Sequence, residues 1–368
     1  MDGEYAAAGV DYSLIDPFKR VMQGVKARSS GHPYYRRDVK VYRDGSFEYL
    51  HADRIPHRWL QVTEGLGNKN WIAEWMYERT GDPKYFAGIG IDTVMMAVVD
   101  LLRVGALPVA YTAEVAAGDS EWFADEARRH MIAEGFLEAC RLSGMALVGG
   151  ESPSLRYLIR AEPPVKSAPV FSGCATGLIA PLWHGIRQDL LSPGAVIIGM
   201  PSSGLHANGI SLVIKRALTL PDQFLHVLPS GRTLGEEALI PTVSYVALFE
   251  ALLDEPQVKS ELLAVVPATG DGVVKLLRDP RSFTYRIEHW IEVPSIFRFM
   301  RELGVPLEEC LRTFNWGIGL YLFVSEYGAD RVLALGRQNG YELVHLGHVD
   351  SGSKSVVFNP EKLKLYPE

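Results

Sequence analysis

One apolar stretch, residues 86–118, constrains the fold more than any other part of the chain. Its sequence is FAGIGIDTVMMAVVDLLRVGALPVAYTAEVAAG. Apolar residues recur at helical spacing from Val94 to Leu102, which predicts a buried helix. Gly105 suits the end of that helix, and Pro108 prevents the helix from continuing. The stretch therefore predicts a core helix followed by a strand.

Two acidic residues interrupt this apolar stretch. Asp92, expected at the start of the helix, and Asp100 are eight residues apart. Eight residues make just over two helical turns, so both carboxylates can point towards one side. A buried carboxylate without a partner costs several kcal/mol. Two explanations stay open: Asp92 caps the helix while Asp100 pairs with an arginine, or both carboxylates hold a magnesium ion.

Composition narrows the class of protein. The 368 residues are enough for two domains, and 47% hydrophobic with 22% charged residues is typical of a globular protein. A net charge of −7 without a basic run argues against nucleic-acid binding. Cys140, Cys174 and Cys310 are scattered without zinc spacing, which favours core positions in a reducing, cytoplasmic protein. The N-terminus lacks a secretory apolar region, and we expect no apolar run long enough to span a membrane.

Glycine-bearing turns follow several expected strands. They are TEGLGNKN at 63–70, Gly-Gly-Glu at 149–151, SSGLHANG at 202–209, ATGDG at 268–272 and FNWG at 314–317. Glycines let backbone N–H groups approach a ligand, and a turn that opens a helix favours a phosphate or carboxylate. The turn at 202–209 has no lysine and so is not a P-loop. Taken singly, each turn is explained equally well as a simple structural turn.

The remaining pattern predicts an α+β fold with mixed or antiparallel sheets. We expect a first helix capped by Asp16, a hairpin around Asp44-Gly45, and a helix over 121–142. Later strands and helices alternate without regularity. A less apolar, turn-rich segment near 183 suggests two domains, 1–182 and 183–368.

Taken in order, these segments resemble the aminoimidazole ribonucleotide synthetase family, also called phosphoribosylformylglycinamidine cyclo-ligases. The resembling stretches are YAAAGVD, TEGLGNKN, GIGIDTVMMAVVDLLRVGALP, LVGGES, PSSGLHANGISLV, ATGDGVVKLL and RTFNWGIGL. The resemblance implies an N-terminal domain that binds ATP and adds strands to a barrel-like core of a homodimer. It also implies a C-terminal α/β domain on the substrate side, with a mixed sheet and flanking helices, and a cleft between the domains for both ligands.

The resemblance also assigns residues, with ATP and Mg²⁺ as cofactors and a phosphoribosyl small molecule as substrate. The implied magnesium ligands are Glu64, Asp92, Asp100 and Glu151. These four acids also contact the nucleotide, together with Gly65, Gly67, Lys69, Gly149 and Gly150. The implied substrate contacts are Ser203, Gly204, His206, Asn208, Gly209, Thr269, Gly270 and Asn315. Lys69, Asp100 and His206 are the implied catalytic residues, although His206 alone is also explained as a turn histidine.

The chain departs from the family pattern at several places. Glu64 replaces an aspartate, Val99 replaces an asparagine and Asp271 replaces a glycine. A Tyr/Arg-rich segment at 33–51 stands where a glycine-rich one is expected, and SPSLRYLI follows Gly-Gly-Glu. The expected function is the ATP-dependent cyclo-ligase of purine synthesis. Two alternatives remain: another ATP-dependent enzyme acting on a different amide or small molecule, or a nucleotide-binding regulatory protein that has lost catalysis.

Overall fold

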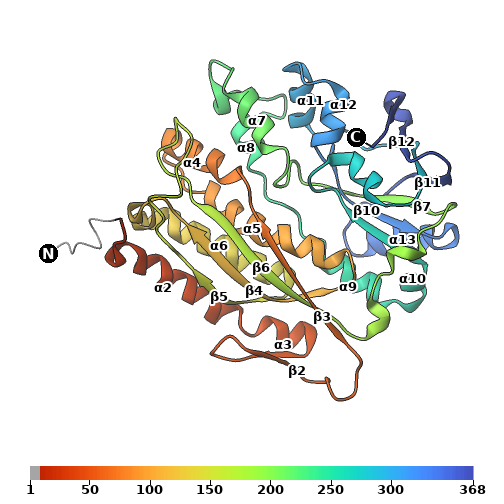
Figure 1. Ribbon diagram of the computed structural model, residues 1–368, viewed down its shortest axis with the longest axis horizontal. Helices are drawn as coiled ribbons and strands as arrows, with labels where there is room; N and C mark the ends of the chain where they lie inside the picture. The colour runs from red at the N-terminus through yellow and green to blue at the C-terminus, as the bar shows by residue number, and fades with distance from the viewer. Residues whose placement is uncertain (1–8, 368) are drawn as a thin grey trace. The chain divides into compact units, whose positions relative to one another are not determined.

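The computed structural model describes residues 9–367, so part of the YAAAGVD stretch lies outside the described residues. The chain forms two compact units, which we describe separately (Figure 1). Unit 1 contains the chain up to Leu101 together with Leu107–Ala180, and unit 2 contains Leu102–Ala106 together with the chain from Pro181. Each unit has its own mixed sheet with helices, which confirms the predicted α+β class.

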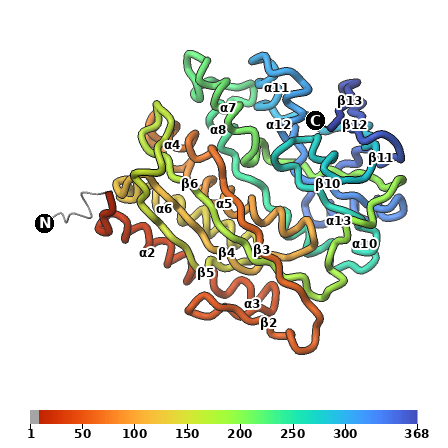
Figure 2. The backbone as a smooth tube through the Cα atoms, in the orientation of Figure 1, coloured from red at the N-terminus to blue at the C-terminus, as the bar shows by residue number. Residues whose placement is uncertain are grey.

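Unit 1 is built on a four-stranded sheet in the order β3-β6-β4-β5. The bounds are Arg58–Gly65 for β3, Leu107–Ala116 for β4, Ala146–Glu151 for β5 and Val170–Ile179 for β6. Strands β4 and β5 are parallel, because a helix connects them, whereas β6 is antiparallel to both β3 and β4. Figure 2 shows β3 and β6 running side by side. The predicted hairpin is confirmed, with β1 at Val39–Val41 and β2 at Phe47–Tyr49.

The core helix α5 (Tyr85–Leu102) begins earlier than the sequence suggested. Asp92 therefore lies in the middle of the helix, and the prediction that it caps the start is wrong. The extra turns form because α5 packs directly against α6 (Glu126–Ser143) through two glycines. A Cβ on Gly90 would lie 2.7 Å from Ile132 O, and one on Gly135 would lie 2.1 Å from Ala87 O. Only residues without a side chain allow this approach.

By length and composition, α5 is the one helix among residues 9–367 that could cross a membrane. This contradicts our expectation that no apolar run reaches that length. However, 78% of the stretch is buried inside the protein, as in a core helix.

Other helices of unit 1 differ from prediction mainly at their starts. Helix α2 (Tyr12–Ser29) is capped by Asp11, because the Asp11 carboxylate accepts a hydrogen bond of 2.9 Å from Ser13 N–H. Asp16 lies inside that helix. Asp125 caps α6 in the same way, after a short 3₁₀ helix η1 at Ser120–Ala124. Two helices were not predicted, α3 at His32–Arg37 and α4 at Lys69–Thr80.

Unit 2 contains a seven-stranded sheet in the order β13-β12-β9-β11-β7-β10-β8. The strands are β7 Val196–Pro201, β8 Leu262–Pro267, β9 Phe283–Ile287, β10 Ile318–Val324, β11 Val344–Ser351, β12 Ser355–Phe358 and β13 Leu363–Leu365. Its α-helices are α7 Ile210–Ala217, α8 Leu234–Ala238, α9 Val246–Asp254, α10 Pro256–Glu261, α11 Ser295–Glu302, α12 Leu307–Thr313 and α13 Ala329–Gln338. Strands β9, β12 and β13 were not predicted. The segment after β8 is a 3₁₀ helix, η5 (Gly272–Arg278).

A buried ionic cluster attaches α4 to η1 and α6. Glu74, which is 1% exposed, accepts a hydrogen bond of 2.6 Å from Trp122 Nε1 and lies 3.3 Å from Arg128 Nη2. Burial raises the pKa of Glu74 to about 7, although the Arg128 charge opposes the shift. The cluster fixes the helix that follows the TEGLGNKN turn.

We predict that Gly135→Ala destabilises the protein by more than about 2 kcal/mol, because the added methyl group collides with the backbone of α5. Gly24→Ala in α2 is the matched control, since nothing lies within 4 Å of its Cβ position. That control should be neutral or stabilise by up to about 1 kcal/mol. Denaturant unfolding monitored by circular dichroism measures both, and equal effects would contradict the close helix contact.

We also predict a pH dependence of stability from Glu74. Its pKa is higher in the folded state than in the unfolded chain, so its contribution is fully present below about pH 4.5 and is lost as pH rises through about 7. The unfolding free energy of the native protein, minus that of Glu74→Gln, should fall by up to about 3 kcal/mol between these values. Glu78→Gln, on the exposed side of α4, should show no such trend. Parallel pH profiles for Glu74→Gln and the native protein would refute the assignment.

Candidate functional site

Strand pairing in unit 1 brings several predicted residues to one end of the sheet. Gly65 of β3 lies opposite Ser172 of β6, Ser172 lies opposite Glu114 of β4, and Glu114 lies opposite Glu151 of β5. Three strand spacings separate Gly65 from Glu151, about 14 Å. The TEGLGNKN turn and the Gly-Gly-Glu strand end therefore share this end of the sheet.

Lys69 and Asp92 form an ion pair with each other. Their Nζ and Oδ2 atoms are 2.7 Å apart, and both side chains are completely buried. Burial lowers the pKa of Lys69, and the neighbouring Asp92 carboxylate opposes this shift. These two side chains therefore bind each other, whereas the resemblance implied a nucleotide contact for Lys69 and a magnesium ion for Asp92.

Asp100 lies away from the other predicted acids. The Tyr111 hydroxyl donates a hydrogen bond of 3.1 Å to Thr93 O, so the middle of α5 faces the middle of β4. The short connection between them makes α5 and β4 run in opposite directions. Along the helix, Asp100 therefore lies about 10 Å from Thr93, towards the start of β4. Glu151 pairs with Glu114 and so lies about 10 Å from the level of Tyr111 in the opposite direction, towards the end of β4.

The predicted four-carboxylate magnesium site is accordingly not formed within the described part of the chain. There, no three His, Cys, Asp or Glu side chains are grouped closely enough to hold a metal ion. The physical reason is that the length of α5 separates Asp100 from the sheet end, while Asp92 turns towards Lys69. Glu64 is half-buried and Glu151 is exposed.

A cavity of about 280 Å³ lies between α2 and the end of β5. Its lining combines the predicted Gly-Gly-Glu residues with polar and apolar side chains of α2: Phe18, Lys19, Met22, Gln23, Lys26, Ala113, Val115, Leu147, Gly149, Gly150, Glu151 and Ser152. Lys19, Gln23 and Lys26 follow helical spacing and so share one face of α2. Lys19 Nζ lies 4.0 Å from Glu151 Oε1. The cavity offers two ammonium groups beside a glycine backbone, a combination that suits an anionic ligand.

Sequence reasoning missed Glu114, Lys19 and Lys26. Glu114 accepts a hydrogen bond of 3.1 Å from Ser172 Oγ and adjoins Glu151 across the β4–β5 ladder. A signal for Glu114 was present, because it and Thr112 alternate with buried residues along an otherwise apolar strand. The lysines gave no such signal, since basic residues on a surface helix are ordinary.

In unit 2, strand order gathers the predicted substrate residues. Strand β10 is antiparallel to both β7 and β8, which flank it. The turns that follow β7 and β8 therefore lie beside the turn that precedes β10. This brings together at one sheet edge all eight residues assigned to the substrate: Ser203, Gly204, His206, Asn208, Gly209, Thr269, Gly270 and Asn315.

Asn315 joins two of these turns. Its buried amide donates a hydrogen bond of 2.7 Å to Gly204 O and accepts bonds from Ser202 Oγ at 3.0 Å and Gly317 N–H at 2.8 Å. The third turn, at 268–272, lies against the turn at 202–209, because a Cβ on Gly270 would lie 3.9 Å from Asn208 Oδ1. Asn315 thus acts first as a link between turns.

His206 is buried in its turn, with a left-handed φ of 55°. Its Nε2 accepts a hydrogen bond of 3.2 Å from Ser203 N–H, and its ring lies against Tyr245. A nitrogen that accepts this bond is unprotonated, so the structure supports the turn-histidine explanation. The acid/base role stays a prediction.

The departure at Asp271 has a structural explanation. Asp271 adopts a left-handed φ of 77°, where the family has glycine, and its carboxylate binds Arg278 through contacts of 2.8 and 2.6 Å. Arg278 offsets the added negative charge. The neighbouring Thr269 hydroxyl accepts a hydrogen bond from Lys275.

Comparison with known proteins agrees with this arrangement. The family model described as AIR synthase related protein, N-terminal domain, matches residues 61–179, and the corresponding C-terminal domain matches residues 192–359. A relative from Lactobacillus helveticus, named phosphoribosylformylglycinamidine cyclo-ligase, is 34% identical over 96% of this chain and 98% of its own. One of the same name from Thermococcus kodakarensis is 35% identical over 94% and 95%.

Solved structures share the fold at lower identity. Escherichia coli HypE, a hydrogenase maturation protein, superposes with a TM-score of 0.62 at 15% identity, covering 95% of this chain and 96% of that one. A HypE structure in complex with ATP gives a TM-score of 0.54 at 17% identity, with 82% and 81% covered. The matched domains and relatives together place this chain in the AIR synthase related family, to which it belongs over nearly its whole length.

Proposed function

We propose that this protein is an ATP-dependent cyclo-ligase that converts formylglycinamidine ribonucleotide to aminoimidazole ribonucleotide, with release of ADP and phosphate, in purine synthesis. The observation that carries the proposal is the similarity to relatives of that name across almost the full length of both chains. The gathering of all eight predicted substrate residues at one sheet edge in unit 2 agrees with it.

The reaction requires activation of a poor leaving group. The formyl amide oxygen attacks the γ-phosphorus of ATP, and the bond to ADP breaks. The amidine nitrogen then attacks the activated carbon, the carbon–oxygen bond breaks, and the oxygen leaves with the phosphate as the ring closes. Such a transfer depends on positioning and charge neutralisation more than on a reactive side chain.

We assign the nucleotide to the α2–β5 cavity, with Lys19 and Lys26 facing its phosphates. Mg²⁺ keeps several waters and is held in proteins by one or two carboxylates together with substrate phosphates. Glu151, which lines the cavity, is the carboxylate that fits that requirement, so a four-carboxylate cage is unnecessary. Magnesium bound there would neutralise phosphate charge.

The remaining predicted residues receive indirect roles in this proposal. The buried Lys69–Asp92 pair holds the start of α4, next to the end of β3 with Glu64 and Gly65 and the turn with Gly67. Unit 1 would thus be the nucleotide-binding and dimerisation domain, and unit 2 the substrate-side domain, in a cytoplasmic homodimer. Thr63, Cys174 and Thr112 form one row on the sheet and remain at least partly exposed, which favours a second copy covering that face.

A second candidate is another ATP-dependent enzyme of this fold with a different small-molecule substrate. The β1–β2 hairpin and the loop after Glu151, both of which depart from the family pattern, favour it.

We predict that the purified protein releases ADP from ATP only when formylglycinamidine ribonucleotide is present. A coupled assay for ADP, run over a panel that includes formylglycinamide ribonucleotide and thiamine monophosphate, measures this. If ADP is released only with a different panel member, that compound replaces formylglycinamidine ribonucleotide as the proposed substrate. Binding of ATP without turnover on any member would favour a regulatory protein.

We predict that Lys26→Ala and Lys19→Ala each raise KM for ATP about tenfold, because a hydrogen bond to a charged group contributes about 1.5–3 kcal/mol. KM for the second substrate should stay within about twofold. Lys166→Ala, an exposed lysine of unit 1 outside the cavity, is the control and should leave both constants unchanged. An unchanged KM for ATP in both cavity variants would remove the nucleotide from this cavity.

A further inference from the structure

The tip of the β1–β2 hairpin lies against two walls of the α2–β5 cavity. Gly45 has a left-handed φ of 92°, and a Cβ there would lie 2.9 Å from Val148 O and 3.8 Å from Lys26 Nζ. Lys26 lines the cavity, as do Leu147 and Gly149 on either side of Val148. The hairpin tip is therefore part of the rim of this cavity.

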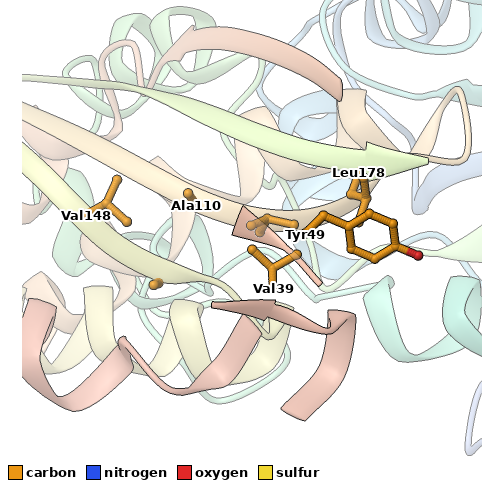
Figure 3. Packing of buried hydrophobic residues seen from close by; sticks show 7 residues of the cluster. Val39, Tyr49, Ala110, Val148 and Leu178 are labelled. Carbon is orange, nitrogen blue, oxygen red and sulfur yellow. The ribbon is translucent and has the colours of Figure 1, made fainter. Parts of the chain in front are cut away.

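The hairpin packs on the sheet at its base, and its tip is ordered by internal hydrogen bonds. Near its base, Val39 and Tyr49 pack with Ala110, Val148 and Leu178 of the sheet in one buried cluster (Figure 3). At its tip, the Asp44 carboxylate accepts hydrogen bonds from Ser46 N–H at 2.9 Å and from Ser46 Oγ at 2.6 Å. This anchoring gives the tip a defined position beside the cavity.

The tip also adds a negative charge at this rim. Asp44 precedes Gly45, and its carboxylate interacts electrostatically with the Lys26 ammonium group. The Ser46 hydrogen bonds, and to a smaller extent the Lys26 charge, lower the pKa of Asp44, which is therefore ionised at neutral pH. On the other side of the cavity, Glu151 lies beside Lys19. Each cavity lysine thus has an acid next to it.

We propose that Asp44 is a specificity residue of the α2–β5 cavity, which makes the cavity discriminate against metal-free polyphosphates and accept a nucleotide as its magnesium complex. This inference rests on the proposed function, because it takes the cavity ligand to be a nucleotide. A metal-free triphosphate brings its full negative charge against Asp44 and Glu151, whereas bound magnesium removes two of those charges. The Coulomb repulsion between the ligand and these two carboxylates is therefore weaker for the magnesium complex than for the metal-free nucleotide. Asp44 lies in the segment 33–51, which departs from the family pattern.

The test uses Asp44→Asn in the full chain. Asparagine keeps an oxygen that accepts the Ser46 hydrogen bonds but removes the charge. Isothermal titration calorimetry gives Kd for ATP with EDTA and for ATP with excess MgCl₂. We expect Asp44→Asn to bind metal-free ATP about tenfold more tightly and the magnesium complex only about threefold more tightly. Raising the salt concentration to about 0.5 M should remove most of both gains.

Asp53→Asn is the matched control, since Asp53 is an exposed acid of the same segment outside the cavity lining. It should leave both Kd values unchanged. If the native protein binds ATP but Asp44→Asn gives the same Kd ratio as the control, the specificity role is refuted and the proposed function stands. If the native protein binds ATP in neither form, the proposed nucleotide cavity itself is refuted. A thermal unfolding curve for each variant establishes that the fold is retained.

Discussion

Backbone hydrogen bonding between strands decides where the predicted functional residues of this protein meet. In unit 1, the ladder from β3 through β6 and β4 to β5 places Gly65 and Glu151 at the same sheet end, although 86 positions separate them in the chain. In unit 2, the antiparallel position of β10 between β7 and β8 brings together turns near 204, 270 and 315. The register of a sheet cannot slip by one residue without reversing every side chain, so these positions are strongly determined.

Buried charges in unit 1 hold helices together. Lys69 and Asp92 join the start of α4 to the middle of α5, and Glu74 with Arg128 joins α4 to α6. A buried ion pair adds little net stability, but removing one partner leaves an uncompensated charge in the interior. Such pairing is enough to account for a buried charge in a core helix such as α5, whether or not a ligand binds it. The presence of Asp92 in the family motif is therefore weak evidence for a metal ion, because its pairing with Lys69 already accounts for the buried carboxylate.

The parts that depart from the family lie beside the candidate sites. Asp271 takes a backbone conformation that favours glycine, and Arg278 compensates its charge. The β1–β2 hairpin lies on the rim of the α2–β5 cavity, where Asp44 adds a negative charge near Lys26. Both changes alter the charge distribution at the candidate sites while the sheets and turns are preserved. Substitutions of this kind can change which ligand binds without changing the fold.

The sequence alone determined the local features: the core helix before β4, the hairpin at Asp44-Gly45, the glycine-bearing turns and, through their order, the family. These depend on periodicity, turn chemistry and motifs, which are properties of neighbouring residues. It also located the turns that are predicted to contact substrate, although their assembly follows from strand pairing over long distances. Only the tertiary structure decided that Lys69 pairs with Asp92, that Asp100 lies far from Glu151, and that Glu114 joins the sheet end. Spacing along one helix says which side chains share a face, but the direction of that face depends on packing, here on the glycine contacts between α5 and α6.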